Sequence, residues 1–394
     1  YVNKIVNPIC FSYQGEYYDI PKEAIIETFL KQSNSIFNDK WLEHLNIDST
    51  PILKDTAGKS FFHFKNCMVE VSKEGVDILE TTNKMDGFCI WEDSQLKYNF
   101  DYIQQNENCQ FAKFIKNITN ENNTPKRYDA LITAIGYMMH HYFKESQGQS
   151  VILYDEAITD LKNPQGGSGK GLIVKAINKM RAVTKIDGKS FDSNDKFKFQ
   201  LIKPSTQVVW IDDARPTFDF SCLHSNLTDG WTIERKFLPQ IYFVPADSPK
   251  TIICSNSIIN SGGSTNLRRQ FVVEIGNYYS KKIKIGTETP IEDEHGLFFS
   301  NNWSKQDWDC FFSFMLDCSY QYFNYGLLAY DGINVAVNQL RQSTNDEFVE
   351  WVNSKEFEKN KRYNTKDELY NFNALFYDEQ RPLGQRKFFE YLKE

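Results

Sequence analysis

The chain contains no long apolar run and no cysteine motif. None of its hydrophobic stretches approaches the roughly 20 residues that a membrane span requires. Its first thirty residues lack the basic-then-apolar pattern of a secretion signal. The eight cysteines include no CxxC pair, and each lies among apolar or aromatic neighbours. We therefore expect a cytoplasmic protein without a membrane partner, whose cysteines are buried free thiols rather than zinc ligands or disulfides.

The composition is that of a folded chain of several domains. Of the 394 residues, 41% are hydrophobic and 15% aromatic, which suffices for two or three ordinary cores. The net charge of -7 argues against a protein coated in positive charge for binding nucleic acid. One stretch differs: residues 162–203 hold ten Lys or Arg against three Asp. This stretch suits a phosphate ligand, although solvated lysines on a helix face look the same.

The pattern of the sequence divides the chain into four parts. Alternating residues near 60–80 predict short paired strands, and apolar residues at helical spacing predict helices over 21–45 and 127–143. His140 and His141 lie on the second of these helices, where adjacent positions point apart, so we expect a core or surface role rather than metal binding. We expect a mixed, partly helical section over 1–145, an α/β core over 146–280, a helical extension over 281–335 and a small helical or winged-helix-like tail over 336–394. The chain begins with Tyr1 and stops inside a helix-like pattern, so we expect it to be a piece of a longer protein.

A glycine-rich segment, PQGGSGKGLIVKAINKM, carries the strongest chemical signal. Its glycines free the backbone to turn N–H groups toward a phosphate, and Lys170 adds a positive charge at the start of the next helix. The pattern departs from GxxxxGK[ST] at Pro164 and at Gly171, so a glycine-rich turn without a ligand remains an alternative. The residues expected around the phosphate are Gly166, Gly167, Ser168, Gly169, Lys170 and Gly171.

Two acids follow about forty residues later. In QVVWIDDA, the apolar strand 208–211 directly precedes Asp212 and Asp213. In phosphate-loop NTPases the first acid of such a pair holds magnesium and the second orients or deprotonates the attacking water. Solvation of a strand end is the simpler reading of the pair alone. Its order and spacing relative to Lys170 favour function.

A third apolar strand, TIICSN, ends in the polar Asn256. A side-chain amide there can sense the terminal phosphate or hold water, while a turn-forming Asn is the alternative. Arg268 and Arg269 then precede another strand. An arginine so placed can reach the nucleotide of a neighbouring subunit and stabilise the charge of the transition state. Either of the two could instead pair with a surface acid.

Between the second and third strands, DGWTIERKFLPQIYFVPADSPK alternates as a β-hairpin does. Arg235, Lys236 and Phe237 fall where the tip would project. A basic and aromatic tip suits a strand of nucleic acid, because charge meets the phosphates and the ring offers a stacking face. Most basic turns are merely solvated, so the hairpin alone is weak evidence.

These four elements, in this order, resemble a superfamily 3 helicase, the compact AAA+ motor of viruses, phages and mobile elements. The likeness is greatest to the helicase half of phage and poxvirus-type primase-helicases, whose loops often read GKG, and it covers roughly residues 100–330. It implies an α/β fold built on an AAA+ P-loop NTPase domain. It also implies an ATP-dependent DNA helicase that assembles as a ring, usually a hexamer, and moves 3′ to 5′ on single-stranded DNA in the cytoplasm of a bacterial host.

By that resemblance, each motif residue has a role. Lys170 would bind the β- and γ-phosphates of ATP, Asp212 would hold Mg²⁺ and Asp213 would polarise water. Asn256 would act as the sensor, and Arg268 or Arg269 would act in trans. Lys236, with Arg235 and Phe237 beside it, would grip DNA. The family also implies a primase or polymerase domain or partner, and residues 1–145 hold no obvious set of catalytic acids and histidines for a primase.

Two other functions fit parts of the sequence. A nucleotide-regulated DNA-binding ring or scaffold, with weak or no hydrolysis, would use the same residues to load on an origin or to recruit a polymerase. A small-molecule kinase would use the same loop, but it would leave the hairpin and the two arginines without a task.

Overall fold

The computed structural model describes most of the chain. It covers residues 52–80, 90–103, 109–121, 123–143, 148–156, 167–236, 238–257, 259, 268–330, 340, 343–355, 357–358, 361–377 and 382–393. Within these ranges, no helix is both long and apolar enough to cross a membrane. The helix expected over 21–45 lies outside the described residues, as do the predicted site residues Gly166 and Phe237. The boundaries between the four predicted parts stay predictions.

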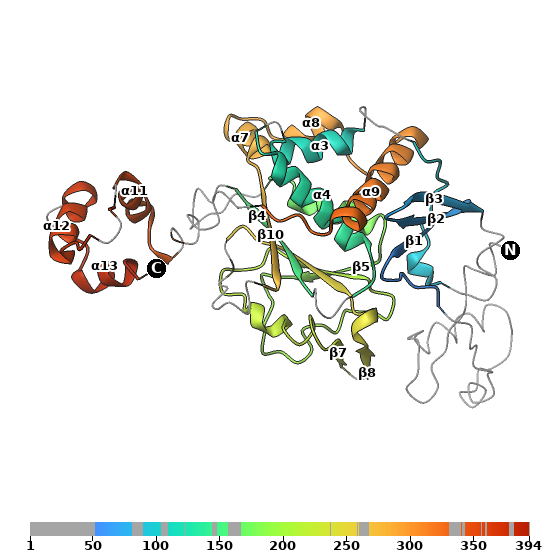
Figure 1. Cartoon of the computed structure of the whole chain (residues 1–394), viewed down its shortest axis with the longest axis horizontal. Coiled ribbons are helices and arrows are strands. Elements are labelled where there is room, and N and C mark those ends of the chain that lie inside the picture. Colours follow the sequence, from blue (N-terminus) through green and yellow to red (C-terminus); the bar gives the residue numbers. More distant parts are fainter. Residues whose placement is uncertain are drawn as a thin grey trace.

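A parallel five-stranded sheet forms the centre of the main body (Figure 1). Its strand order is β10-β4-β9-β6-β5, so the chain crosses over between strands that are not neighbours in sequence. All four neighbouring pairs are parallel. The carboxyl ends of the strands therefore lie along one edge. The strands are β4 (Ser150–Asp155), β5 (Val183–Asp187), β6 (Val208–Asp212), β9 (Lys250–Cys254) and β10 (Gln270–Ile275).

Alternate residues of these strands enter two different cores. Val151 and Leu153 of β4 join one cluster, while Ile152 and Tyr154 join the other. Both sets are almost completely buried, which explains why the strands read as continuous apolar runs. The predicted α/β core is thereby confirmed as a mixed α/β fold around a parallel sheet.

Helices pack against the first of these cores (Figure 1). The long helix α9 carries the aromatic stripe that the sequence predicted, and its Phe311, Phe312 and Met315 are fully buried. Helix α9 lies along α4, with Gly136 of α4 at the crossing; a Cβ there would stand 2.1 Å from the carbonyl oxygen of Cys318. The helices of the main body are α3 (Gln110–Thr119), α4 (Pro125–Met139), α5 (Lys170–Asn178), α7 (Tyr278–Lys284), α8 (Pro290–His295) and α9 (Lys305–Tyr325).

The second core lies under the connections between strands. It contains aromatic residues of the segments after β5 and β6 together with Trp231 and Phe243 of a hairpin. The hairpin consists of antiparallel strands β7 (Trp231–Arg235) and β8 (Leu238–Phe243), as the sequence predicted. Short 3₁₀ helices η4 (Phe220–Leu223) and η5 (Pro245–Asp247) flank it.

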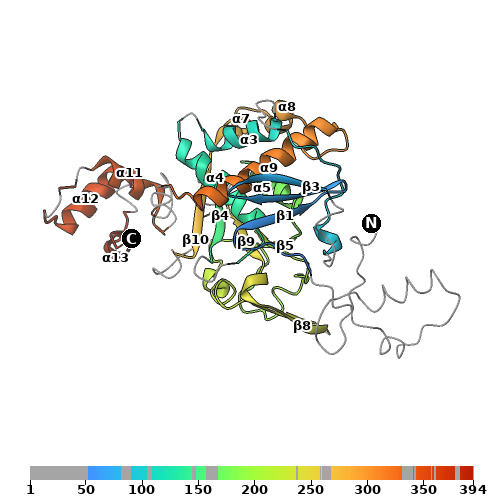
Figure 2. The same ribbon diagram turned by 45° about the vertical axis from the view of Figure 1, so that its right-hand side comes forward.

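A small antiparallel sheet precedes the main body and packs beside α9 (Figure 2). Its strands β1 (Lys59–His63), β2 (Cys67–Ser72) and β3 (Gly75–Glu80) confirm the paired strands expected near 60–80. The 3₁₀ helix η2 (Glu92–Ser94) follows. Asp55, just before β1, forms an ion pair with Arg181, which follows α5, and both side chains are 4% exposed. The front section is therefore joined to the main body by a buried ion pair.

The helix predicted over 127–143 has different ends. It begins at Pro125 and ends at Met139, and His140 has an extended backbone. His140 and His141 therefore do not lie on the helix, contrary to the prediction. The chain turns here because Asp55 accepts the backbone N–H of His141 at 2.7 Å and Thr56 O contacts the His140 ring at 2.7 Å. The expected core role is confirmed for His140, which is 3% exposed.

Three helices of the C-terminal part share a core of their own (Figure 1). They are α11 (Asp346–Ser354), α12 (Thr365–Phe376) and α13 (Gln385–Tyr391). Aromatic side chains fill the space between them, with Trp351, Phe372 and Phe388 fully buried. The described residues of this part form helices and no strand, so its winged-helix character stays a prediction.

Six cysteines are described, and none of them forms a disulfide. Five are buried, as predicted, whereas Cys222 is half-buried. Burial raises the pKa of Cys109 to about 12 and that of Cys222 to about 11. Cys10 and Cys89 lie outside the described residues.

Candidate nucleotide-binding site

The described part of the glycine-rich loop lies at the carboxyl edge of the central sheet. Helix α5 begins at Lys170, and its N-cap Gly169 has a φ of 101°. Gly167 has a φ of 103°. Both angles belong to the left-handed region that side chains other than glycine rarely adopt. The glycines therefore allow the turn that brings Lys170 to the first position of the helix.

Neighbouring side chains also require these glycines. A Cβ on Gly169 would stand 2.6 Å from the ring of Phe114, and one on Gly167 would stand 2.6 Å from Ile283. The position of Gly171 is different, because a Cβ there would have no atom within 4 Å. A hydroxyl side chain would thus fit at residue 171, although the sequence has none.

The Lys170 ammonium is 7% exposed and contacts three side chains. It forms an ion pair with Asp155 at 2.5 Å and donates hydrogen bonds to Asn256 Oδ1 at 2.8 Å and to Ser168 Oγ at 3.3 Å. Asn256 in turn donates from Nδ2 to Asp213 Oδ1 at 3.1 Å. A continuous chain of polar contacts therefore joins Lys170, at the end of the glycine-rich loop, to the second predicted acid.

The two acids stand at the end of β6. Asp212 is the last residue of the strand, one residue later than predicted, and Asp213 follows with a φ of 56°. Such a left-handed conformation is uncommon for a residue other than glycine. The Asp212 carbonyl accepts the Gly188 N–H at 2.6 Å, and a Cβ on Gly188 would stand 2.6 Å from that oxygen.

Each acid has a lysine partner from the neighbouring strand or the turn after it. Lys185 pairs with Asp212 at 2.6 Å, and Lys189 pairs with Asp213 at 2.7 Å. The hydrogen bond and charge of Asp213 raise the pKa of Lys189. Lys185 also lies 4.5 Å from the centre of the Trp210 ring. Both lysines are more than half exposed, so the two carboxylates are accessible from solvent.

The floor of the site is the end of β9. That strand ends at Cys254, two residues before Asn256 and earlier than the sequence suggested. Burial raises the pKa of Cys254 to about 12, so this thiol is protonated and neutral at physiological pH. Ser255 Oγ donates to the Ala214 carbonyl at 2.7 Å, which ties the segment after β9 to the segment after β6.

The oxygen-rich side chains fit a hard divalent cation. Magnesium is usually bound through one or two carboxylates together with substrate phosphates, rather than by a complete protein cage. Asp212 and Asp213 supply such carboxylates beside the loop that would hold the phosphates. Within the described residues there is no cluster of three or more metal-ligating side chains. Asp212 and Asp213 therefore suit a cation that is also coordinated by phosphate oxygens.

The two arginines lie elsewhere on their own chain. Arg268 and Arg269 precede β10 as predicted, and β10 is parallel to β4. They therefore stand at the amino edge of the sheet, opposite Lys170. The Arg269 carbonyl accepts the Ser150 N–H at 2.8 Å, which fixes the entry to β4 beside them. The fold brings together Lys170, Asn256 and the two acids, and it leaves the arginines apart.

The hairpin tip lies beside a second basic loop. Arg235 ends β7 and Lys236 forms the turn, close to the predicted tip. The Lys236 ammonium lies 5.4 Å from the centre of the Phe197 ring, and the Lys196 ammonium lies 5.0 Å from it. Phe197 is half-buried, and it belongs to the connection between β5 and β6. Lys196, Lys236 and the partly exposed Phe197 ring therefore lie together, whereas the sequence predicted only the hairpin residues at this place.

Sequence reasoning missed three residues of the site. Asp155 ends the strand that precedes the phosphate loop, and this position at the carboxyl edge could have drawn attention to it. Lys185 and Lys189 belong to the basic stretch noted from the charge count, but nothing local indicated that they face the acids.

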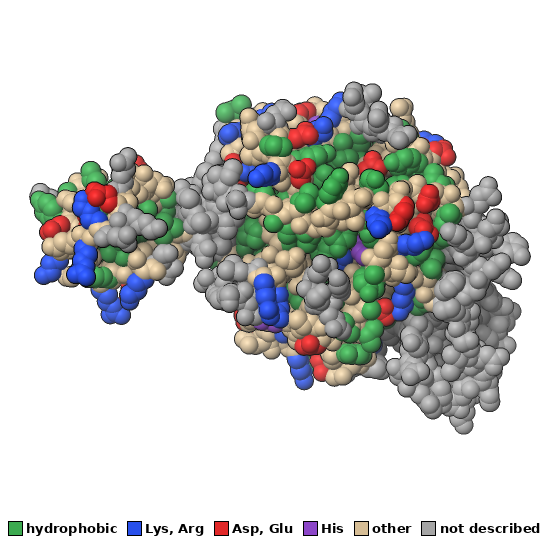
Figure 3. All heavy atoms as spheres, in the orientation of Figure 1, with side chains coloured by type: hydrophobic (Ala, Val, Ile, Leu, Met, Phe, Trp, Pro, Cys, Tyr) green, Lys and Arg blue, Asp and Glu red, His purple; other side chains and the backbone are tan. Residues whose placement is uncertain are grey.

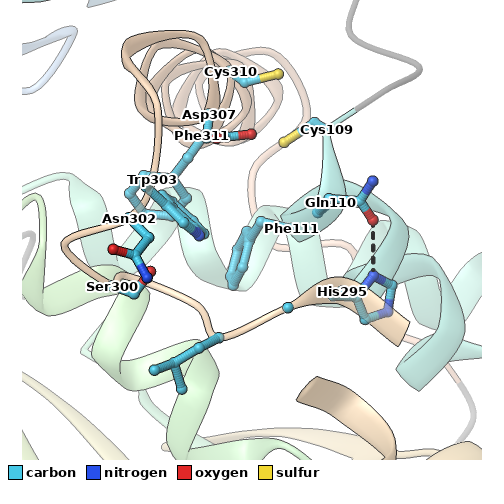
Figure 4. A pocket seen from close by; sticks show the side chains of 12 residues that line it. Cys109, Gln110, Phe111, His295, Ser300, Asn302, Trp303, Asp307, Cys310 and Phe311 are labelled. Carbon is cyan, nitrogen blue, oxygen red and sulfur yellow. Dashed lines mark hydrogen bonds between the residues drawn. The ribbon is translucent and has the colours of Figure 1, made fainter. Parts of the chain in front are cut away.

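A pocket of about 260 Å³ lies away from these residues (Figure 4). It is formed by the start of α3, the end of α8 and the segment leading into α9, with Phe111, Trp303 and Phe311 among its walls. His295 faces into the same region and contacts Gln110 at 3.1 Å. Of the predicted site residues that the structure describes, none lines this pocket.

No protein-family model matches this sequence, and no curated protein matches it either. Similar solved structures include two apo structures of the C-terminal region of NrS-1, with TM-scores of 0.36 and 0.34 and identities of 14% and 15%. Each alignment covers 80% of this chain, and 82% or 83% of the other chain. Another is a JCV helicase bound to a substituted acetamide, with a TM-score of 0.25 and 10% identity, over 47% of this chain and 61% of that one.

Proposed function

We propose that this chain is an ATP-driven motor that moves along single-stranded DNA, a helicase of the superfamily 3 type with an AAA+ core. The observation that carries the proposal is the position of Lys170. Its buried ammonium lies at the carboxyl edge of a parallel sheet, at the start of a helix, and is joined through Asn256 to Asp213. A triphosphate at this edge would meet the Lys170 ammonium and the backbone N–H groups at the start of α5.

Each residue then has a separate task. The Lys170 ammonium binds the β- and γ-phosphates. Asp213 accepts a proton from the attacking water, and Asn256 keeps its carboxylate in place through the hydrogen bond from Nδ2. Magnesium, held by Asp212, would neutralise phosphate charge when bound. Because residue 171 has no hydroxyl, we expect water to fill that coordination position.

The position of Arg268 and Arg269 supports action between subunits. At the amino edge of the sheet they are remote from Lys170 of the same chain, so a role in hydrolysis requires the site of a neighbouring copy. A ring of identical subunits supplies such a neighbour at every site. The proposal therefore includes a homo-oligomer, a hexamer by analogy with the family that the sequence resembles.

The basic side chains around Phe197 support the DNA-binding half of the proposal. Lys236 and Lys196 would neutralise phosphates, and the exposed part of the Phe197 ring would stack against a base. On the face of the main body drawn in Figure 3, Lys and Arg side chains lie among Asp and Glu side chains. DNA binding is proposed for the local cluster of Lys196, Phe197 and Lys236.

Phosphate release with and without single-stranded DNA separates the motor from the scaffold alternative. A motor hydrolyses ATP faster when DNA is present, and Lys170→Ala abolishes both the basal and the stimulated rate. Lys236→Ala should lower the stimulation while ATP still binds. Nucleotide binding without turnover, in the presence of DNA, would instead support a nucleotide-regulated ring that loads on DNA or recruits a polymerase.

A further inference from the structure

The strongest contact of Lys170 is with a carboxylate that has no role in the proposed reaction. Asp155 Oδ2 lies 2.5 Å from the Lys170 ammonium, and the two side chains are 13% and 8% exposed. The other carboxylate oxygen, Oδ1, is buried and has no hydrogen-bond partner within the described part of the chain. The charge of Asp155 is thus balanced there chiefly by Lys170.

The backbone at the end of β4 is held in place around Asp155. The next residue, Glu156, donates its N–H to the Ile275 carbonyl at 2.8 Å. Its side chain pairs at 3.2 Å with Arg127, which is completely buried and also lies 3.5 Å from Glu274 of β10. Asp155 therefore cannot withdraw from the loop without disturbing a buried ion-pair network.

A triphosphate must compete with these contacts. A lysine ammonium has three N–H donors, and Asp155, Asn256 and Ser168 accept all three. A phosphate oxygen that binds Lys170 must displace one of them. It also brings negative charge close to the Asp155 carboxylate, and like charges repel strongly at a site shielded from water.

We propose that Asp155 is a positioning residue that holds the Lys170 ammonium in the nucleotide-free state and competes with the triphosphate for it. Nucleotide affinity is then set by the exchange of a carboxylate for a phosphate at one ammonium. The carboxylate keeps Lys170 at the mouth of the loop when the site is empty, and it favours release of the nucleotide after hydrolysis. This inference rests on the proposed function, because it assumes that Lys170 binds a nucleotide.

The test is equilibrium binding of a fluorescent ATP analogue to the full chain in EDTA. Asp155→Asn keeps the shape of the side chain and removes its charge. We expect it to bind the analogue about tenfold more tightly than the wild type. Asp187→Asn is the matched control, because Asp187 ends β5 at the same edge and its hydrogen bonds stay within its own turn. This control should stay within about twofold of the wild type, since exposed charges are screened by salt.

The other outcomes are equally clear. Unchanged or weaker binding by Asp155→Asn overturns the inference. A parallel titration in Mg²⁺ tests the alternative role: if Asp155→Asn loses the Mg²⁺ dependence that the wild type shows, Asp155 is a metal ligand and the inference is overturned. Asp155→Ala should shift the affinity in the same direction as Asp155→Asn, and unfolding curves check that both are folded. Failure of the wild type to bind, or equal binding by Lys170→Ala, would refute the proposed function and the inference with it.

Discussion

Replacing Arg181 should destabilise the protein far more than removing an exposed ion pair. The Arg181 guanidinium forms four hydrogen bonds, and three of them join the main body to the front section. It donates to the Asp55 carboxylate at 2.9 Å, to Ser60 Oγ at 2.5 Å, and to the carbonyls of Phe61 and Met139 at 3.0 Å and 2.6 Å. Arg181→Met keeps an unbranched side chain and removes all four.

The magnitude follows from burial. Asp55 and Arg181 are each 4% exposed, so the variant leaves a buried carboxylate without its cation. Breaking a buried pair in this way costs about 3–5 kcal/mol. Lys54 offers a matched control, since its pair with Asp247 also links the front section to the main body but is 50% and 32% exposed. Lys54→Met should cost no more than about 1 kcal/mol.

Urea unfolding followed by circular dichroism measures the difference. The midpoint should fall clearly for Arg181→Met and barely for Lys54→Met. The double variant Asp55→Asn with Arg181→Met should recover part of the loss, because no unpaired charge is then buried. Equal small shifts for the two single variants would refute the idea that the Asp55–Arg181 contact secures the front section.

Four further predictions concern other parts of the molecule. Burial lowers the pKa of His140 to about 3 and those of His63 and His141 to about 4. The unfolded chain therefore binds more protons between pH 6.5 and 4, and the free energy of unfolding measured with urea should fall over that range, by about 3 kcal/mol for His140 alone; a flat profile would contradict this. Gly169→Ala should lower the melting temperature and weaken ATP binding, because it places a side chain at a φ of 101° and against the Phe114 ring. Unchanged affinity for ATP would count against phosphate binding by this loop. Gly171→Ser should leave the fold intact, since a Cβ at this position meets no other atom. The wild type, which lacks the hydroxyl, should still hydrolyse ATP; activity seen only in the variant would show that the hydroxyl is required. Lys196→Ala and Lys236→Ala should each weaken binding to single-stranded DNA. Each should also reduce the slope of the logarithm of the binding constant against the logarithm of the salt concentration by about 0.7, whereas Lys366→Ala on α12 should change neither. Identical titrations for the three variants would exclude DNA binding by the cluster around Phe197.

The sequence predicts the central sheet well because its strands are buried on both faces. The runs VILYD, VVWID and KTIIC are mostly apolar, and each lies in a strand. The residue at which a long helix ends is harder to predict from the sequence. His140 and His141 continue the pattern of α4, but hydrogen bonds to Asp55 and Thr56, more than eighty residues earlier, end the helix at Met139. Local spacing carries no information about such contacts.

The part of the candidate site that could be predicted comes from short local motifs. Asp212 ends β6, Asn256 follows β9 and Lys170 begins the helix after β4, so their meeting at one edge follows from the topology. Asp155 could not be assigned a role, because the sequence does not show which side chain at the carboxyl edge contacts Lys170. The proximity of Phe197 to Lys236 likewise joins two loops that the sequence separates by 39 positions.

Amide hydrogen exchange with and without a nonhydrolysable ATP analogue tests the central claim most directly. If a triphosphate lies at the carboxyl edge, peptides covering the start of α5 and the residues around Asn256 should exchange more slowly when the analogue is bound. Lys170→Ala should abolish this protection. Protection confined to the pocket around Trp303, or none at the start of α5, would contradict the account.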